Sequence, residues 1–223
     1  MSDPGPLALV GGGEWRAGCD FDASLLAASG GSTVVVLPTA AAYEGASAAV
    51  SASKDWFGGL GASVSPVMAL GRPDAFDPAQ VAVVREARFV YLGGGSALHL
   101  RSVLKESPMW EALLSAWREG AVVAASAAAA MVLGDPMVDP RGGAFTLGLG
   151  LVENLAVLPE AATWSHDRVR RTIRLAPAGV VLAAIDAQTA LIRSSAGGWS
   201  VSGRGTVRLY QGGAEVGTEV LPG

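Results

Sequence analysis

Short apolar runs alternate with longer segments of helical periodicity through the first 130 residues. Runs that are apolar at nearly every position are typical of strands buried on both faces of a parallel sheet. The predicted strands lie at residues 7–10, 33–40, 62–70, 88–92 and 121–126. The predicted helices lie at 44–60, 78–87 and 98–119, the last broken at Pro108. This alternation predicts an α/β fold with a mostly parallel central sheet.

After residue 145 the pattern changes to short strands separated by turns, with one helix-like segment at 166–175. We expect this half to complete the same sheet and to add an antiparallel C-terminal edge. The run from 198 to 213 alternates and ends in a glycine pair, which is typical of an edge hairpin. With 223 residues, half of them apolar, the chain is predicted to form a single α/β domain over residues 1–223.

Charge and composition exclude several classes of function. The net charge is −4 and the sequence has no tract of lysine and arginine, so no nucleic-acid or anionic-membrane partner is expected. Cys19 is the single cysteine, which rules out an internal disulfide and a cysteine-rich metal site. No basic segment followed by a long apolar one stands at the N-terminus, and no uncharged apolar run reaches about 18 residues. We therefore expect a soluble, cytoplasmic protein.

One serine, Ser126, stands inside the alanine-rich stretch VVAASAAAAMVLGD. If 121–125 is a strand and 127–133 a helix, this serine lies on a sharp strand-to-helix turn. Such a turn lifts a nucleophile above the sheet, and it needs small residues two positions before and after, here Ala124 and Ala128. A helix N-cap serine would give the same local pattern, so both interpretations stay open.

A second feature is the stretch YLGGGSALHL, in which a strand meets three glycines and then a helix start. Consecutive glycines allow backbone N–H groups to approach a ligand closely. In a parallel sheet this turn can lie at the same edge as Ser126 and supply an oxyanion donor. A phosphate-binding loop or a tight turn is the alternative, but the lysine of a Walker loop is missing.

A serine nucleophile needs a base, and the chain has two histidines. His99 lies in the apolar helix ALHLRSVL, where a structural role is expected. His166 lies in a polar loop that opens a helix after a strand, where a base could reach the turn at Ser126. His166 is the better candidate for the base.

Taken in order, these motifs resemble one family. The series comprises LVGGGE, VVVLPTA, YLGGGSALHLRSVL, the Ser126 turn, LGLGLV, a histidine before an arginine-rich helix, IDAQTALI and SGRGTVRLY. It resembles cyanophycinase and peptidase E, the aspartyl dipeptidase. The resemblance implies a serine peptidase on a class I glutamine amidotransferase-like, flavodoxin-like fold, a three-layer sandwich, acting without metal or organic cofactor. It also implies a small, Asp-containing peptide as substrate and a homodimer as a possible assembly.

The resemblance places the family's catalytic roles on particular residues. The nucleophile falls on Ser126 and the general base on His166. The oxyanion donors fall on the amide of Gly94 or Gly95 and on that of Ala127. The family's acidic residue some 15–18 positions after the nucleophile is replaced by RGGA, and Asp139 is the nearest substitute. Asp135, Asp167 and Asp186 are further possibilities.

Four arginines follow His166 closely: Arg168, Arg170, Arg171 and Arg174. On a helix, residues 167, 170, 171 and 174 share one face. Arg170 and Arg171 are expected to bind substrate carboxylates by paired hydrogen bonds. A solvated charged face, partly neutralised by Asp167, is the alternative. Glu14, at the end of the first strand, is expected either to line the site or to border a turn.

Two functions follow from these motifs. The first is a serine-type peptidase or related hydrolase of small acidic peptides, with Ser126 as nucleophile and His166 as base. The second is a catalytically degenerate family member that binds a peptide or another small molecule. Glutamine amidotransfer is disfavoured, because it needs a thiol where Ser126 stands.

Overall fold

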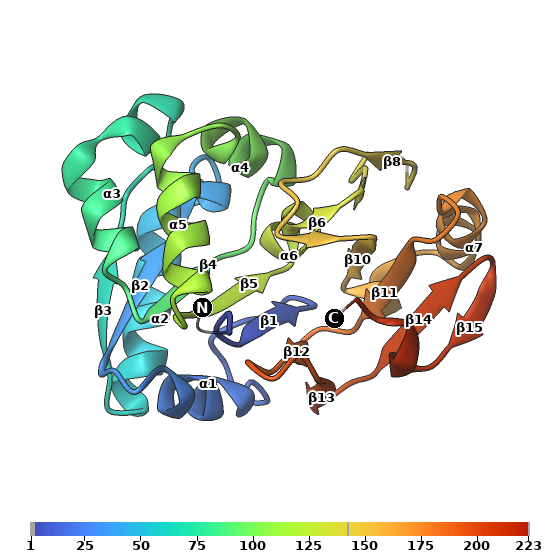
Figure 1. Cartoon of the computed structure of the whole chain (residues 1–223), viewed down its shortest axis with the longest axis horizontal. Helices are drawn as coiled ribbons and strands as arrows, with labels where there is room; N and C mark the ends of the chain where they lie inside the picture. Colours follow the sequence, from blue (N-terminus) through green and yellow to red (C-terminus); the bar gives the residue numbers. More distant parts are fainter. Residues whose placement is uncertain (1–2, 142, 223) are drawn as a thin grey trace.

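A computed structural model describes residues 3–141 and 143–222. Its main sheet has the strand order β13-β12-β1-β5-β4-β2-β3 (Figure 1). Five of these strands run parallel: β1 (Leu7–Val10), β2 (Thr33–Leu37), β3 (Ser63–Pro66), β4 (Phe89–Leu92) and β5 (Val122–Ser126). The antiparallel edge consists of β12 (Thr189–Arg193) and β13 (Trp199–Gly203). The predicted strands of the first half are therefore confirmed, β1 with the same bounds and the other four with shorter ones.

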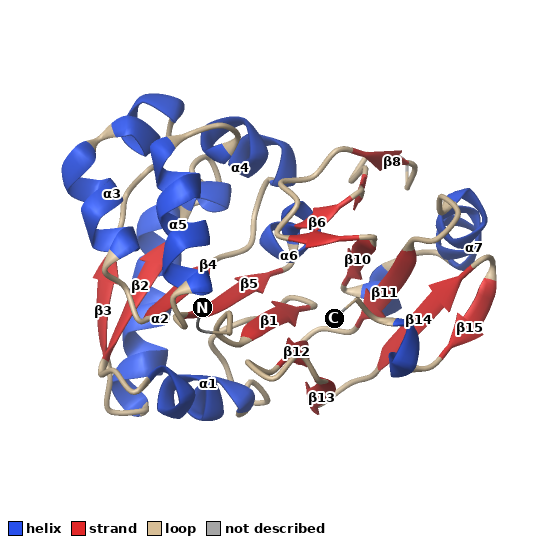
Figure 2. Ribbon diagram, in the orientation of Figure 1, coloured by secondary structure: helices blue, strands red, loops and turns tan. Residues whose placement is uncertain are grey.

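Helices cover both faces of this sheet (Figure 2). One face packs against α1 (Phe21–Ser29) and α2 (Ala46–Gly59). The other packs against α3 (Pro78–Arg85), α4 (Ala97–Leu104) and α5 (Pro108–Arg118). The predicted break at Pro108 is confirmed. Pro108 begins α5 because Ser107 caps the helix, its hydroxyl accepting the Trp110 N–H at 3.2 Å.

The second half forms a separate sheet with the order β15-β14-β11-β10-β6-β9. Its strands are β6 (Gly134–Asp135), β9 (Val152–Glu153), β10 (Leu155–Pro159), β11 (Val181–Ile185), β14 (Val207–Gln211) and β15 (Ala214–Val216). The expectation that these residues complete the main sheet is wrong: only β12 and β13 join it. The run predicted as an edge hairpin, 198–213, is instead divided, because β13 joins the main sheet and β14 the second one. Its glycine pair does form a hairpin turn, with Gly212 and Gly213 both at positive φ, but this turn joins β14 to β15.

Shorter elements complete the fold. A small hairpin pairs β7 (Met137–Val138) with β8 (Phe145–Thr146). Helix α7 (His166–Leu175) lies beyond β10 and β11 (Figure 1). Single 3₁₀ turns occupy Thr39–Ala41, Arg72–Phe76, Ala161–Thr163 and Thr218–Val220. In the described ranges, every helix is too short or too polar to cross a membrane.

Helix α6 (Ala128–Leu133) connects the two sheets. All six of its side chains are buried. One apolar core runs from Leu9 of the main sheet, through Ala129 and Leu133, to Val157 and Val181 of the second sheet. Methyl side chains at the start of α6 let it lie close to β5 and β10, so the strand-to-helix turn before it is held from both sides.

Candidate active site

Three loops meet where neighbouring parallel strands end. Ser126 is the last residue of β5 and pairs in register with Val10, the last residue of β1. The loop after β1 carries Glu14, and the loop after β4, the other neighbour of β5, carries the triple glycine 93–95. The carboxyl edge of a parallel sheet is the usual place for a ligand site. The structure thus brings the serine and the glycine turn together, as the sequence predicts.

The carboxylate of Glu14 joins these two features. Its Oε2 accepts the hydroxyl of Ser126 at 2.8 Å, and its Oε1 accepts the N–H of Gly94 at 2.8 Å. Ser126 itself is fully buried. The hydroxyl is therefore directed at a half-buried carboxylate that lies between it and the site cavity. Hydrogen bonds to a charged acceptor are among the stronger ones in proteins.

The tight turn itself is at Ala127. This residue has φ 49° and ψ −113°, a backbone conformation that residues other than glycine rarely adopt. Its N–H donates to the Val10 carbonyl at 2.9 Å, which extends the ladder between β5 and β1 by one bond. Its methyl group lies 3.2 Å from the point where a side chain at Gly94 would begin. The strained residue that faces the site cavity is thus one position after Ser126.

The three amides predicted to bind the oxyanion differ in their hydrogen-bond partners. The N–H of Gly94 donates to Glu14 and that of Ala127 to Val10. Within the described residues, the N–H of Gly95 has no hydrogen-bond partner in the protein. Gly95 has φ 137°, and a side chain there would collide with the carbonyl of Ala40. Position 95 therefore requires glycine, and its amide is the one available to a ligand.

The structure does not bring His166 to Ser126. His166 is the exposed first residue of α7, which lies on the outer side of the second sheet, away from the end of β5 (Figure 1). No hydrogen bond joins the two side chains in the described part of the chain. The other histidine, His99, bonds the Leu70 carbonyl through Nε2 at 2.8 Å, in keeping with its expected structural role.

Asp139 lies in the β7–β8 hairpin, paired with Arg141. The guanidinium of Arg141 donates to both carboxylate oxygens, at 3.0 and 2.7 Å, and its backbone N–H to one of them. These bonds lower the pKa of Asp139 below its ordinary value. The carbonyl of the next residue, Pro140, accepts a bond from Arg168 of α7. The Asp139 loop therefore lies beside the start of α7 and not beside Glu14.

A cavity of about 560 Å³ opens in front of Glu14. It is lined by the β1 loop, the glycine turn, Ala127 and one side of α2. Its ionisable side chains are Glu14, Glu44, Glu160 and Arg16. Carboxylates outnumber the single guanidinium, so the cavity has a negative electrostatic potential and favours a cationic group such as a free amino terminus. In residues 3–141 and 143–222, no set of three or more His, Cys, Asp or Glu could hold a metal ion.

Behind Glu14 lies a buried cluster of polar side chains. Trp15 packs on Tyr91 with ring centroids 5.3 Å apart. Asp22 of α1 is fully buried, and its Oδ2 accepts the indole N–H of Trp56 at 2.9 Å. Burial raises the pKa of Asp22 to about 7, with a further contribution from the charge of Glu14. Burial likewise raises the pKa of Cys19 to about 11 and that of Tyr91 well above its ordinary value.

The arginines of α7 line a different cavity, of about 610 Å³. Arg170, Arg171 and Arg174 surround it with Asp167, and none of them lines the cavity at Glu14. Arg168 points elsewhere, with its guanidinium 3.6 Å from the centre of the Trp164 ring. Residues 167, 170, 171 and 174 therefore share one face of α7, as predicted, but this face lines a cavity separate from the one at Glu14.

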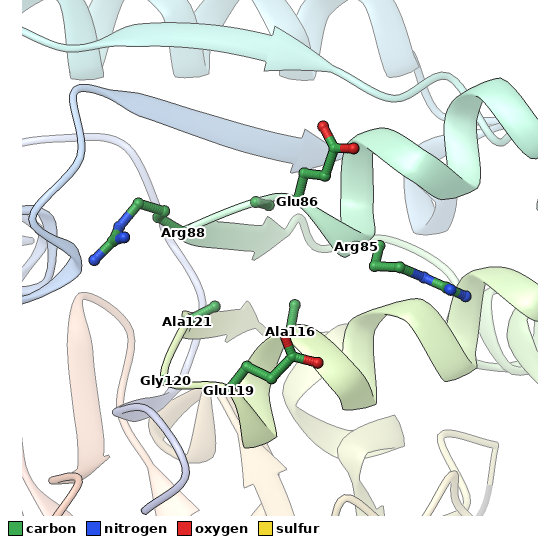
Figure 3. Close-up of a pocket in the computed structure, with 8 residues that line it drawn as sticks. Arg85, Glu86, Arg88, Ala116, Glu119, Gly120 and Ala121 are labelled. Carbon is green, nitrogen blue, oxygen red and sulfur yellow. The ribbon is translucent and has the colours of Figure 1, made fainter. Parts of the chain in front are cut away.

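A third hollow, of about 350 Å³, lies at the opposite edge of the main sheet, at the amino ends of β4 and β5. Figure 3 shows Arg85, Glu86, Arg88 and Glu119 pointing in different directions around it. Arg88 donates to the Ser29 carbonyl and Glu119 accepts from Ser115. Its charged groups do not converge on one point, so this hollow offers no site for chemistry.

Comparison with known proteins shows the family and the fold of the chain. The model of peptidase family S51 matches residues 7–195. The chain is similar to the crystal structure of a peptidase from an acI-B1 Actinobacterium, with 28% identity, a TM-score of 0.85, and coverage of 96% of this chain and 93% of that chain. Its fold is also similar to that of a candidate peptidase E protein from Listeria monocytogenes EGD-e, with 16% identity, a TM-score of 0.65, and coverage of 93% and 98%. No curated protein matches the chain. The structural matches confirm the predicted α/β fold.

Proposed function

The chain belongs to peptidase family S51, the serine peptidases that its motifs resemble, and we propose that it cleaves short peptides with Ser126 as the nucleophile and Glu14 as its base. The hydrogen bond of 2.8 Å between the Ser126 hydroxyl and Glu14 Oε2 carries this proposal. A base must lie within hydrogen-bond reach of the proton that it takes, and Glu14 meets this condition. His166, the base predicted from the sequence, is exposed at the start of α7 and would need α7 to approach β5.

In the proposed reaction, Glu14 takes the hydroxyl proton as Ser126 Oγ bonds to the carbonyl carbon of the peptide. The negative charge that develops on the carbonyl oxygen is held by the Gly95 N–H, joined by the Gly94 N–H as protonated Glu14 releases it. Glu14 then gives its proton to the leaving amine, and the C–N bond breaks. Water hydrolyses the resulting acyl ester and restores Ser126. Because Ser126 is buried behind Glu14, the carboxylate must turn aside for the substrate to enter.

The substrate is proposed to be a short peptide with a free amino end and at least one acidic side chain. Carboxylates of the cavity at Glu14, including Glu44 and Glu160, favour the ammonium group. The guanidinium groups of Arg170 and Arg171 favour a carboxylate at the second cavity. The two cavities share no lining residue, so the preference for a free amino end is the one that acts directly at Glu14.

Covalent labelling by a fluorophosphonate probe tests this function. We expect Ser126→Ala and Glu14→Gln to reduce labelling at least about 100-fold, in the range found when a catalytic proton acceptor is lost. His166→Ala should keep wild-type labelling if Glu14 is the base. Ser102→Ala, which removes an exposed hydroxyl on α4, is the matched control. Equal labelling of the wild type and Ser126→Ala would overturn the proposal.

A second candidate function is peptide binding without cleavage, and the position of Ala127 favours it. The residue in the strained turn faces the cavity with a methyl group, while the Ser126 hydroxyl is turned inward. On this hypothesis the wild type resists the probe, yet an Asp-containing dipeptide raises its melting temperature. Labelling that Ser126→Ala abolishes would exclude it.

A further inference from the structure

The edge of the main sheet at β13 is unpaired along its backbone. β13 is the last strand of this sheet, beyond β12, and Figure 1 shows it at the lower margin of the molecule. Its five residues pair one to one with β12, from Trp199 opposite Arg193 to Gly203 opposite Thr189. In the described residues no strand lies on its other side, so half of its backbone groups are available to a partner.

Two hydrogen bonds show which positions of β13 face this open edge. Just before the strand, Gly198 accepts the N–H of Ser194 at 2.8 Å, and just after it, Arg204 donates to the carbonyl of Gln188 at 3.0 Å. In an antiparallel pair, only alternate residues direct their N–H and C=O groups at the partner strand. Because both bonds involve even-numbered residues of this strand and the register between them is continuous, the even-numbered positions face β12. The odd-numbered positions direct their backbone groups at the open edge.

The outward-facing positions are Trp199, Val201 and Gly203. Val201 is the middle residue of the strand, and its side chain is 46% exposed although it is apolar. The strand WSVSG contains no charge and no proline, the residues by which proteins usually keep an edge strand from pairing. Nothing in the sequence of β13 therefore opposes the addition of another strand.

The other outer strands of the two larger sheets are protected from such pairing. Among the described residues, Pro66 ends β3, Glu153 lies in β9 and Glu215 lies in β15. A proline has no N–H to donate to a further strand, and a carboxylate is costly to bury against one. β13 thus differs from these three edges in the feature expected of an interface.

We propose that β13 is an interface for a second copy of this chain, whose own β13 pairs with it antiparallel across a two-fold axis at Val201. Antiparallel pairing of identical strands needs one residue that lies opposite itself, and Val201 is both central and outward-facing. The two Val201 backbones then exchange N–H and C=O groups, and their exposed side chains contact each other.

The same register matches the ends of the strand. Trp199 of each copy lies opposite Gly203 of the other, so the largest side chain of the strand faces a position without one. The strand therefore supplies both halves of the pairing by itself, which favours a second copy over an unrelated peptide. The two main sheets would continue into each other through this interface.

Sedimentation velocity over a range of concentrations tests the proposal. We expect the wild type to form a dimer, and Val201→Lys to raise its dissociation constant at least about 10-fold, because two ammonium groups would lie opposite each other. Val83→Lys, the same change at an exposed valine of α3, is the matched control and should leave the dimer intact. A wild type that is monomeric at every concentration would overturn the proposal.

Mixing two variants tests the position of the two-fold axis. Val201→Lys and Val201→Glu should each be monomeric alone and form a dimer when mixed, since position 201 lies opposite itself and opposite charges attract. A dimer that survives in Val201→Lys, or a mixture that stays monomeric, would show that the interface lies elsewhere.

Amide hydrogen exchange gives a residue-by-residue readout. The N–H groups of Trp199 and Val201 should exchange slowly in the wild-type dimer and rapidly in Val201→Lys. Those of Ser200 and Ser202, which face β12, should be protected in both proteins. Protection of Val201 that appears only when an Asp-containing peptide is added would assign the edge to a peptide and overturn the proposal. None of these measurements depends on the reactivity of Ser126.

Discussion

The hydroxyl of Ser126 and the carboxylate of Glu14 lie 2.8 Å apart, although 112 positions separate them in the sequence. The second oxygen of the same carboxylate accepts the Gly94 N–H, also at 2.8 Å. Glu14 therefore connects the serine to the glycine turn. Removal of this one side chain should affect the serine and the oxyanion donors together.

Truncation of Glu14 should be reversible by a small acid. Glu14→Ala is expected to lower probe labelling at least about 100-fold, because Ser126 loses its proton acceptor. Added formate should restore part of the rate by occupying the space of the missing carboxylate. Asp20→Ala, which removes an exposed carboxylate that does not line this cavity, should keep wild-type labelling and show no response to formate. Labelling of Glu14→Ala at the wild-type rate without formate would exclude Glu14 as the base.

Serine at position 127 distinguishes the two candidate functions. Ala127 has the strained backbone of the turn and faces the cavity, so Ala127→Ser would place a hydroxyl beside Gly94. If the chain is an inactive binder, we expect the double variant Ser126→Ala with Ala127→Ser to label with the probe while the wild type does not. Mass spectrometry of the labelled peptide would identify the modified residue. If Ser126 is the nucleophile, the wild type labels at 126 and the double variant loses that adduct.

Two neighbouring glycines should differ sharply in their tolerance of alanine. At Gly95 a methyl group would collide with the Ala40 carbonyl, and φ is 137°, so Gly95→Ala should lower the free energy of unfolding by about 3 kcal/mol or more. At Gly94 the nearest atom is Glu14 Oε1 at 3.1 Å, at the end of a flexible side chain. Gly94→Ala should therefore cost less stability. Denaturation in urea measures both values, and equal losses would contradict the described turn.

The free energy of unfolding should fall as pH rises, because the buried carboxyl group of Asp22 becomes ionised. Its pKa is about 7 in the folded chain and about 3.9 in an unfolded one, so the folded state binds the proton more tightly. The contribution of protonated Asp22 to the free energy of unfolding is complete below pH 4. It is lost as pH rises towards 7, by at most about 1.4 kcal/mol per pH unit. The difference in unfolding free energy between Asp22→Asn and the wild type should therefore increase from pH 4 to pH 7 and then level off. A difference that is constant over this range would contradict a buried, neutral Asp22.

The sequence predicts the main sheet well because its strands are apolar at nearly every position. The meeting of Ser126 with the glycine turn followed from the rule that parallel strands present their carboxyl ends at one edge. The exact place of the tight turn could not be predicted, since Ala124 to Ala130 offer the same small side chain at every position but one. The second sheet was missed for another reason. Its strands are short, and hydrophobic period alone does not show which sheet a strand joins.

The pairing of Glu14 with Ser126 was also beyond the sequence. The stretch GGGEW places the carboxylate of Glu14 at the end of the first strand. From this position, Glu14 was expected either to line the site or only to border a turn. Its orientation depends on Trp15, whose ring packs against Tyr91 and lies 3.0 Å from where a side chain at Gly93 would begin. Such a contact between loop residues far apart in the chain leaves no periodic signal.

The six residues of α6 have no polar face, and all of them are buried, with Ala128 the most exposed at 7%. A helix enclosed in this way cannot detach by itself, since local opening would expose its methyl groups while the two sheets stayed in place. Its amide hydrogens should therefore exchange with deuterated solvent only when the whole molecule opens. The most slowly exchanging backbone of the protein would then lie directly beneath its reactive centre, so any motion that admits a peptide has to come from the loops above.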